Sequence, residues 1–180
     1  MALAAGGCGG GASARQDVSE PAGTYRLSIV RASFPARQHV AQPARLVLEV
    51  RNDGRATVPN LAVTVDSFGE RSKRAGLADP TRPVWVVDRA PAGGTTAYTN
   101  TWALGPLVTG RTKRIEWRLT PVRTGTHRVR LRLAAGLNGR AKAVLAGNRS
   151  PQRALVATIS ARPVDSRVDP ETGAVVRGGG

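Results

Sequence analysis

The chain has 180 residues and a formal net charge of +15, with 41% hydrophobic and only 4% aromatic residues. A chain of this length most simply forms one domain with a buried core, and no apolar stretch is long enough to cross a bilayer as a helix. Cys8 is the single cysteine, and His39 and His127 are the only histidines. An internal disulfide and a zinc-binding motif are therefore both excluded.

Residues 1–23 form the first segment, which is rich in small and polar residues and ends in "EPAG" without periodicity. This composition predicts a flexible tail. From Tyr25 onward the sequence changes to alternating apolar and polar residues, so we expect the folded domain to begin at residue 24.

Five stretches alternate strictly, and the clearest is "HRVRLRL", in which Val129, Leu131 and Leu133 lie opposite arginines. A period of two with one apolar face indicates half-buried antiparallel strands. The other four stretches are "TYRLSIV", "ARLVLEV", "NLAVTVD" and "KRIEWRL". Less regular strand candidates are "VWVVD", "AYTNTWALG" and "ALVATIS".

Turn signals separate these strands. An Asp-Gly pair follows "ARLVLEV", and "TPVRTGTH" joins two alternating runs in a way that predicts a hairpin. The fold class expected from this spacing is all-β: one immunoglobulin-like antiparallel β-sandwich of about seven to nine strands over residues 24–161, with flexible tails. Trp117 alternates with core residues and is predicted to be buried, whereas Trp85 and Trp102 could be core or surface.

Two segments inside the domain do not alternate and are predicted to be end or edge loops, where binding functions usually reside. Residues 67–82 are polar and carry the basic cluster Arg71, Lys73 and Arg74, and residues 136–152 could contain a short helical turn. Residues 162–180 contain two prolines and end in glycines, which predicts an extended, poorly ordered tail.

The positive charge raises nucleic acid or an anionic surface as a partner. Nearly all of it is arginine, spread along the chain within an Ala-, Gly-, Pro- and Val-rich composition, which favours a generally basic, solvated surface. The alternating Arg128, Arg130 and Arg132 could nevertheless form a stripe that holds phosphates or an acidic polymer. An ordinary polar strand face explains the same residues with fewer assumptions.

Catalytic and cofactor motifs are lacking in the sequence. Neither histidine lies in a pattern that suggests a nucleophile with its base, and no phosphate-binding glycine loop occurs. Asp165, Asp169 and Glu171 lack the spacing of a calcium loop, so a solvated acidic turn is expected. We therefore predict a protein that is not an enzyme and that uses no metal or other cofactor.

The stretch "LVLEVRNDGRATVPNLAVTV" resembles CARDB-like and related immunoglobulin-like modules of bacterial surface proteins, and "TGTHRVRLRL" resembles a later strand of that module. The resemblance covers residues 24–135. It implies an immunoglobulin-like fold and, together with the tryptophan-bearing segment around Trp85 and Trp102, an exported protein similar to those of actinobacteria. Such modules serve as spacers, adhesion units and binding domains.

Within this context "LAAGGC" resembles a lipobox, which would make Cys8 the lipid attachment site and "GGGASARQD" the tether. Residues 1–7 contain no basic residue and no room for the apolar core of about 7–15 residues that a signal peptide needs. Either Met1 is internal to a longer signal, or the segment is a plain tail of a cytoplasmic protein. The first alternative is favoured, because composition alone does not explain a sole cysteine followed by a tether.

The sequence thus predicts a cell-membrane lipoprotein on the outer face, with a sandwich domain that acts in protein–protein or cell-envelope interaction. The alternative is a module that binds an anionic cell-wall polymer or nucleic acid through a basic sheet face, with nucleic acid the less favoured ligand. The candidate contact residues are Arg71, Lys73, Arg74, Arg128, Arg130 and Arg132. The identity of the partner and the oligomeric state cannot be derived from the sequence.

Overall fold

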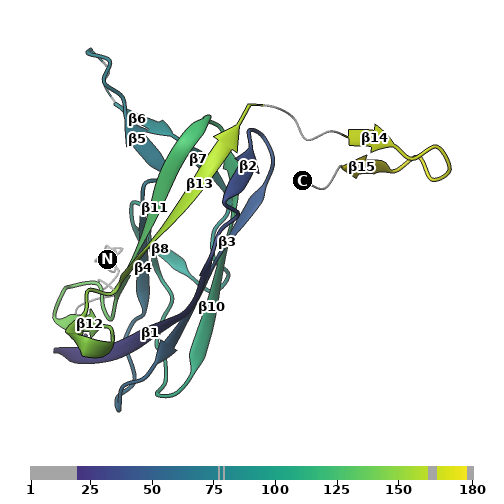
Figure 1. The fold of residues 1–180 in the computed structure, drawn as a ribbon. Coiled ribbons are helices and arrows are strands. Elements are labelled where there is room, and N and C mark those ends of the chain that lie inside the picture. Colours follow the sequence, from purple (N-terminus) through teal and green to yellow (C-terminus); the bar gives the residue numbers. More distant parts are fainter. Residues whose placement is uncertain (1–19, 77, 79, 162–165, 178–180) are drawn as a thin grey trace, which may run out of the picture.

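The computed structural model describes residues 20–76, 78, 80–161 and 166–177, and its regular secondary structure there is almost entirely β-strand (Figure 1). Two sheets form a sandwich. The first sheet has five strands in the order β12-β1-β3-β10-β7. Their bounds are Ala141–Val144 for β12, Gly23–Ser33 for β1, Ala44–Asn52 for β3, Thr112–Pro121 for β10 and Trp85–Arg89 for β7.

The second sheet has six strands in the order β2-β13-β11-β4-β9-β8. Their bounds are Arg37–His39 for β2, Gln152–Ser160 for β13, Gly125–Ala134 for β11, Ala62–Asp66 for β4, Thr101–Ala103 for β9 and Thr95–Tyr98 for β8. The predicted all-β immunoglobulin-like sandwich is confirmed. The number of strands is larger than predicted, because short edge strands such as β2 and β12 are too brief to show alternation.

Two edge pairings are parallel, although the prediction was an antiparallel sandwich. Strand β12 runs parallel to the first residues of β1, and β2 runs parallel to the last residues of β13. All other pairings within the two sheets are antiparallel. Both parallel strands have three or four residues, so the antiparallel frame is unchanged.

The predicted hairpin at "TPVRTGTH" is wrong, because β10 and β11 belong to different sheets. The connection carries the chain across the sandwich from one sheet to the other. The turn after β3 does the same, since β4 lies in the second sheet. Alternation gives each strand one apolar face, but it does not reveal whether consecutive strands pair or face each other across the core.

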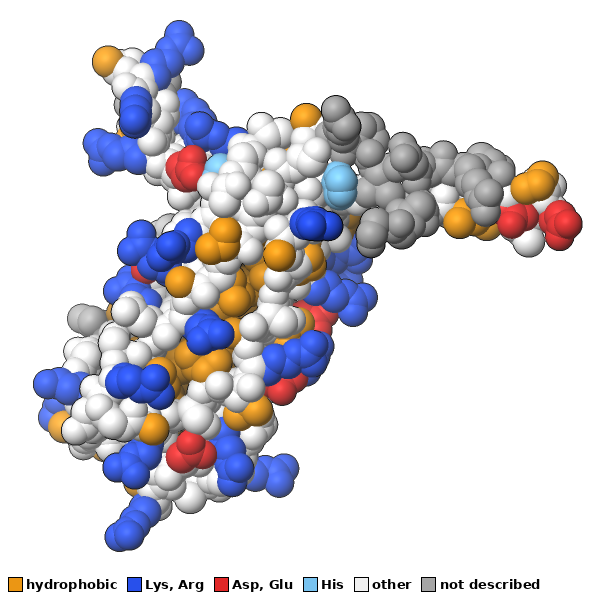
Figure 2. All heavy atoms as spheres, viewed as in Figure 1, with side chains coloured by type: hydrophobic (Ala, Val, Ile, Leu, Met, Phe, Trp, Pro, Cys, Tyr) orange, Lys and Arg blue, Asp and Glu red, His pale blue; other side chains and the backbone are white. Residues whose placement is uncertain are grey.

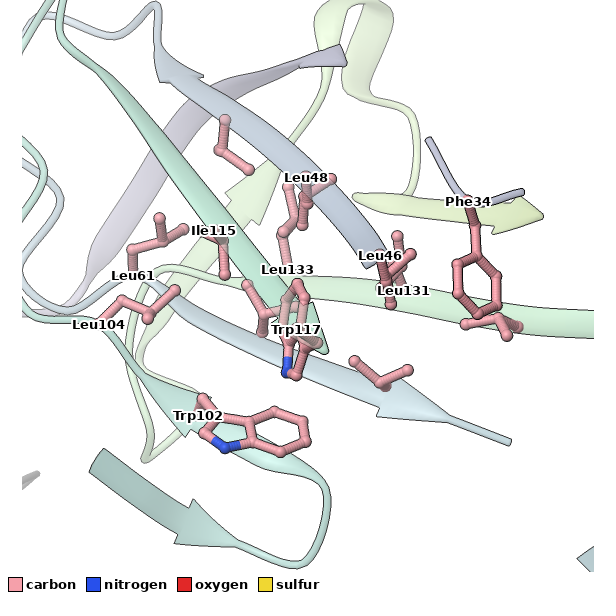
Figure 3. Close-up of a cluster of buried hydrophobic side chains, with 14 of the residues drawn as sticks. Phe34, Leu46, Leu48, Leu61, Trp102, Leu104, Ile115, Trp117, Leu131 and Leu133 are labelled. Carbon is pink, nitrogen blue, oxygen red and sulfur yellow. The ribbon is translucent and has the colours of Figure 1, made fainter. Parts of the chain in front are cut away.

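The core lies between the inner faces of the two sheets (Figure 3). Trp85 and Trp102 are both buried, so the choice that the sequence left open is decided in favour of the core. Trp117 is fully buried as predicted and packs edge-on against Trp102, with ring centroids 5.6 Å apart. With only 4% aromatic residues, the three tryptophans supply much of the large apolar volume of the domain.

Asn52, the last residue of β3, is fully buried and organises the turn that follows it. Asn52 donates from Nδ2 to the carbonyl oxygens of Ala56 (2.9 Å) and Leu107 (2.8 Å), while its Oδ1 accepts from the Gly54 amide (2.9 Å). Each polar atom of the buried amide therefore has a partner. These bonds hold the turn after β3 against the segment that precedes β10.

The N-terminal entry to the domain is fixed by a buried acid. The Glu20 carboxylate is 6% exposed and accepts hydrogen bonds from the amides of Leu137 (2.7 Å) and Asn138 (3.2 Å). A carboxylate cradled by successive amides is a favourable arrangement. The chain therefore enters the sandwich beside the loop that leads into β12, which is where any N-terminal tether would be attached.

Two small hairpins complete the structure. Residues 67–82, predicted as a loop, contain β5 (Gly69–Arg71) paired with β6 (Thr81–Pro83). In the region predicted to be an extended tail, β14 (Ser166–Val168) pairs with β15 (Val175–Arg177) around a turn at Asp169. The extended conformation is thus corrected to a hairpin, and Pro170 lies in its turn, outside the paired residues.

Helix is confined, in the described ranges, to the 3-10 turn η1 (Ala146–Asn148), which lies in the segment where a short helical turn was predicted. Those ranges contain no helix long and apolar enough to span a membrane.

Candidate anion-binding surface

The proposed lipid attachment residue, Cys8, lies outside the described residues, as does the whole segment that resembles a lipobox. The prediction that Cys8 is an attachment point therefore stays a prediction. The structure adds where such a tether would meet the domain, namely at Glu20 beside the 137–138 loop.

The predicted basic cluster Arg71, Lys73 and Arg74 lies at the end of the β5–β6 hairpin, where all three side chains are exposed. The base of this hairpin is held to the sandwich by Glu70. Its carboxylate contacts His127 Nδ1 at 2.6 Å and Arg123 at 3.4 Å. His127 also contacts the carbonyl oxygen of Thr124 at 3.0 Å and packs edge-on against Trp85. His127 is thus a buried structural residue between the hairpin and the core.

The predicted basic stripe on β11 has the expected orientation, since Arg128, Arg130 and Arg132 are exposed while the alternate residues are buried. Arg132 is neutralised by an ion pair with Asp66, with Nε and Oδ2 2.7 Å apart. Arg128 and Arg130 have no carboxylate partner among the described residues. Two unpaired charges on this face are consistent with an ordinary solvated strand surface.

A denser group of arginines lies on the outer face of the other sheet. The pairing registers place Arg118 of β10 directly opposite Arg45 of β3 on one side and Arg89 of β7 on the other. Three arginines therefore form one row across three adjacent strands, and we call Arg45, Arg118 and Arg89 the arginine row. Adjacent strands are about 4.8 Å apart, so these side chains are immediate neighbours.

Arg89 reaches this face because of a β-bulge. The β10–β7 register shifts between Arg118 and Leu119, so that Leu119 pairs with Val87 while Arg118 pairs with Arg89. Without the bulge, simple alternation from the buried Trp85 would place Arg89 on the inner face. The bulge is invisible in the sequence, which explains why sequence reasoning missed the arginine row.

The arginine row borders a shallow pocket of about 300 Å³, which is lined by Arg45, Arg89, Ala90, Ala92, Arg114, Glu116 and Arg118. Four cationic side chains and a single carboxylate line it. The lining of the pocket therefore carries an excess of positive charge.

Two carboxylates on this face, those of Glu49 and Glu116, are committed to one end of the pocket, and that of Asp88 accepts a hydrogen bond from the Thr120 hydroxyl at 2.7 Å. Arg114 contacts both Glu49 (3.0 Å) and Glu116 (2.9 Å), and these hydrogen bonds, that of Glu116 foremost, raise the pKa of Arg114. Arg45 is 3.6 Å from Glu116. Arg118 and Arg89 have no ion-pair partner in the part of the chain that the structure describes, so both guanidinium groups can bind an external anion.

Like charges directly opposite each other on adjacent strands are destabilising. The arginine row combines two such pairs, Arg45 with Arg118 and Arg118 with Arg89. An oxyanion bound between the guanidinium groups would relieve this repulsion, since the planar fork of arginine matches phosphate and carboxylate oxygens. We therefore take the arginine row as the candidate site.

Metal binding has no comparable support. No group of three or more His, Cys, Asp or Glu side chains able to hold a metal ion occurs within the described ranges. Asp169, which the sequence raised and then set aside as a calcium ligand, instead accepts the amides of Glu171 and Thr172 at 2.9 Å in the β14–β15 turn.

Comparison with known proteins gives only distant similarities. No protein-family model matches the chain. No curated protein matches it either. It is similar to a crystal structure of the CARDB domain of a Pyrococcus furiosus protein in complex with di-metal ions, with a TM-score of 0.45 and 14% identity over 76% of this chain and 86% of that one.

A solution structure of the CARDB domain of the same Pyrococcus furiosus protein gives a TM-score of 0.44 and 14% identity, over 77% of this chain and 94% of that one. Red sea bream transglutaminase gives 0.40 and 11% identity over 75% of this chain, which corresponds to 15% of the enzyme. The chain has an immunoglobulin-like sandwich fold. The strand pairing within this chain defines that fold.

Proposed function

We propose that this protein is a non-catalytic immunoglobulin-like binding module whose ligand is an anionic polymer, held on the outer face of β3, β10 and β7. The observation that carries the proposal is the arginine row, in which Arg118 and Arg89 have no carboxylate partner among the described residues. The pocket beside it is open on the sheet surface. It therefore suits an extended polymer better than a small molecule, which an enclosed cavity would hold.

The sequence suggested an anionic-polymer ligand on the basic stripe of β11, and we assign that ligand to the arginine row instead. Each set contains one ion-paired arginine, Arg132 in the stripe and Arg45 in the arginine row. The difference is that the two remaining arginines of the row, Arg118 and Arg89, lie directly opposite each other on adjacent strands, whereas Arg128 and Arg130 lie two residues apart on one strand. A polymer of repeating phosphate or carboxylate groups would present successive oxyanions to these groups. Arg114, tied to Glu49 and Glu116, would limit the site at one end.

We further propose that the module acts in the cell envelope, anchored through Cys8. The support is the lipobox-like "LAAGGC" and the position of Glu20, which attaches the N-terminal segment at the loop beside β12. The test is metabolic labelling with radioactive palmitate, using the gene with its natural upstream DNA. Label that is lost in Cys8→Ser supports the anchor, and an unlabelled wild-type protein contradicts it.

The ligand proposal is tested by titrating the purified protein with sodium polyphosphate and, in a second series, with poly-glutamate. Binding through two or three guanidinium groups predicts that the logarithm of the association constant falls with the logarithm of the salt concentration, with a slope of about −1.5 to −2.5. The two polymers separate phosphate from carboxylate recognition. Absence of binding to both, or binding that does not depend on salt, would contradict the proposal.

A further inference from the structure

One long side of the sandwich is open, between β1 of the first sheet and β13 of the second. Figure 2 shows hydrophobic atoms in a hollow in the middle of this face, with basic side chains around it. A pocket of about 320 Å³ lies here, and its apolar lining includes Leu27, Ile29, Ala32 and Leu145. Ile29, Ala32 and Leu145 pack against the core and remain partly exposed, so the hollow is an incompletely covered part of the core.

The edge of β13 along this opening is unpaired over most of its length. Strand β2 pairs only with residues Thr158 to Ser160, whereas β13 begins at Gln152. The amide of Leu133 in β11 donates to the carbonyl of Pro151. Because hydrogen-bonded pairs alternate along an antiparallel ladder, the odd-numbered residues of β13 are those whose backbone groups bond to β11. The backbone groups of Ala154 and Val156 therefore point to the open side.

Strand β1, on the other side of the opening, is less suited to accept an added strand. Its pairing with β3 is interrupted by a bulge at Val30, whose side chain is 57% exposed. Bulges on edge strands discourage the addition of a further strand. The pairing of β13 with β11 is regular throughout, so β13 is the edge that can accept a partner.

Among the described residues that line this pocket, the ionisable side chains are all arginines. Arg149 and Arg153 both contribute to it, and both are exposed. Arg149 donates from Nε to the carbonyl oxygen of Ala146, which holds η1 at the edge of the hollow. The ligand that complements this lining has apolar groups for the hollow and carboxylates for the two guanidinium groups.

We propose that the open side binds an extended peptide segment of a partner protein whose residues facing the hollow are apolar along the strand and acidic at one end. The segment adds as a strand to the free edge of β13 at residues 152–157 and continues the row that β2 begins. Strand addition supplies main-chain hydrogen bonds, while the alternate side chains that face the hollow provide specificity. Arg153 pairs with the buried Leu131 and therefore lies on the hollow side of β13, so the apolar residues pack beside Ile29 and the acidic end of the same face pairs with Arg149 and Arg153.

The probe is a fluorescein-labelled peptide of about seven residues, long enough to match the free edge. Glutamates at one end and valines at the other occupy the positions that face the hollow, with threonines at the positions between them, so that one face of the peptide is apolar and acidic. Its affinity is measured by fluorescence anisotropy on the whole chain. We expect Arg153→Gln and Arg149→Gln each to weaken binding about threefold to tenfold. Ala154→Pro removes an amide that faces the opening and not β11, so it should abolish binding while the protein stays folded.

The matched control is Arg118→Gln, which removes an exposed arginine from the arginine row and should leave peptide affinity unchanged. This control also separates the two proposals, since polyphosphate binding should respond to Arg118→Gln and not to Arg153→Gln. Peptide affinity that is absent in the wild type, unchanged in Ala154→Pro and Arg153→Gln, or lost in Arg118→Gln overturns the inference. Concentration-dependent dimerisation that Ala154→Pro abolishes, seen by sedimentation, would overturn it by identifying a second copy as the occupant.

Discussion

Asn52 shows how a single buried side chain holds this fold together. Its amide bridges the turn after β3 to the carbonyl of Leu107, which lies 55 residues away in the sequence. The stretch that resembles CARDB-like modules includes this asparagine. Its buried amide makes three hydrogen bonds, which join the turn after β3 to the segment between β9 and β10.

Replacing Asn52 by alanine should therefore destabilise the protein strongly. The change leaves the carbonyls of Ala56 and Leu107 and the amide of Gly54 without their side-chain partner. We expect the free energy of unfolding to fall by about 2–4 kcal/mol, because unsatisfied buried polar groups cost about 1–3 kcal/mol each and part of this is recovered by water. Urea denaturation monitored by tryptophan fluorescence measures the change.

The matched control for that experiment is Thr126→Ala on the exposed face of β11. Thr126 shares one hydrogen bond with Thr158 at the surface, and its loss should change stability by less than about 0.5 kcal/mol. An Asn52→Ala protein as stable as this control would contradict the role assigned to the buried amide.

Among the elements, the outer face of β3, β10 and β7 carries a repulsion between arginines that the proposed anionic ligand would relieve. Because Arg118 lies opposite arginine on both sides, Arg118→Gln should stabilise the protein by about 0.2–1 kcal/mol at low ionic strength. The gain should shrink as salt screens the charges. Thermal unfolding in low and high salt tests this, and destabilisation at low salt would contradict the repulsion.

The β14–β15 turn makes a pH-dependent prediction. The amides of Thr172 and Glu171 lower the pKa of Asp169 below its ordinary value of 3.8. A lowered pKa in the folded turn means that the carboxylate stabilises the turn above about pH 4 and that this contribution is lost as the pH falls through the lowered pKa.

NMR amide shifts of residues 171 and 172 between about pH 5 and pH 2 should follow the protonation of Asp169. Both proteins in this comparison, with Asp169 and with Asp169→Asn, carry Glu171→Gln, which removes the neighbouring carboxyl and keeps the amide of residue 171. In Asp169→Asn the side-chain oxygen still accepts hydrogen bonds but does not titrate in this range, so the same amide shifts should stay constant. Shifts that titrate equally in both proteins would show that Asp169 does not organise the turn.

The sequence predicted which residues form the main strands, but not which strands share a sheet. Strict alternation predicted β1, β3, β4, β10 and β11 because each buries one face of a sheet. It could not show that β10 and β11 lie in different sheets, since both arrangements give the same pattern. It also could not place Arg89, because a bulge reverses the face of that residue without leaving a sequence signal.

At the scale of the molecule, two surfaces on different parts of the sandwich suit different ligands. The outer face of the first sheet presents the arginine row, and the open side between β1 and β13 combines an apolar hollow with an unpaired strand edge. The net charge of +15 was evident from the sequence, but its distribution was not. Burial and strand register decide which arginines are neighbours and which are already paired.

The most direct test of the central claim compares two single substitutions, Arg118→Gln in the arginine row and Arg128→Gln on the β11 stripe. Each removes one exposed arginine with no carboxylate partner among the described residues, so they match in charge and exposure. Polyphosphate affinity at low salt should fall about threefold to tenfold in Arg118→Gln, with a shallower salt dependence, and stay unchanged in Arg128→Gln. Equal losses in both proteins, or a loss confined to Arg128→Gln, would contradict the assignment of the binding site to the arginine row.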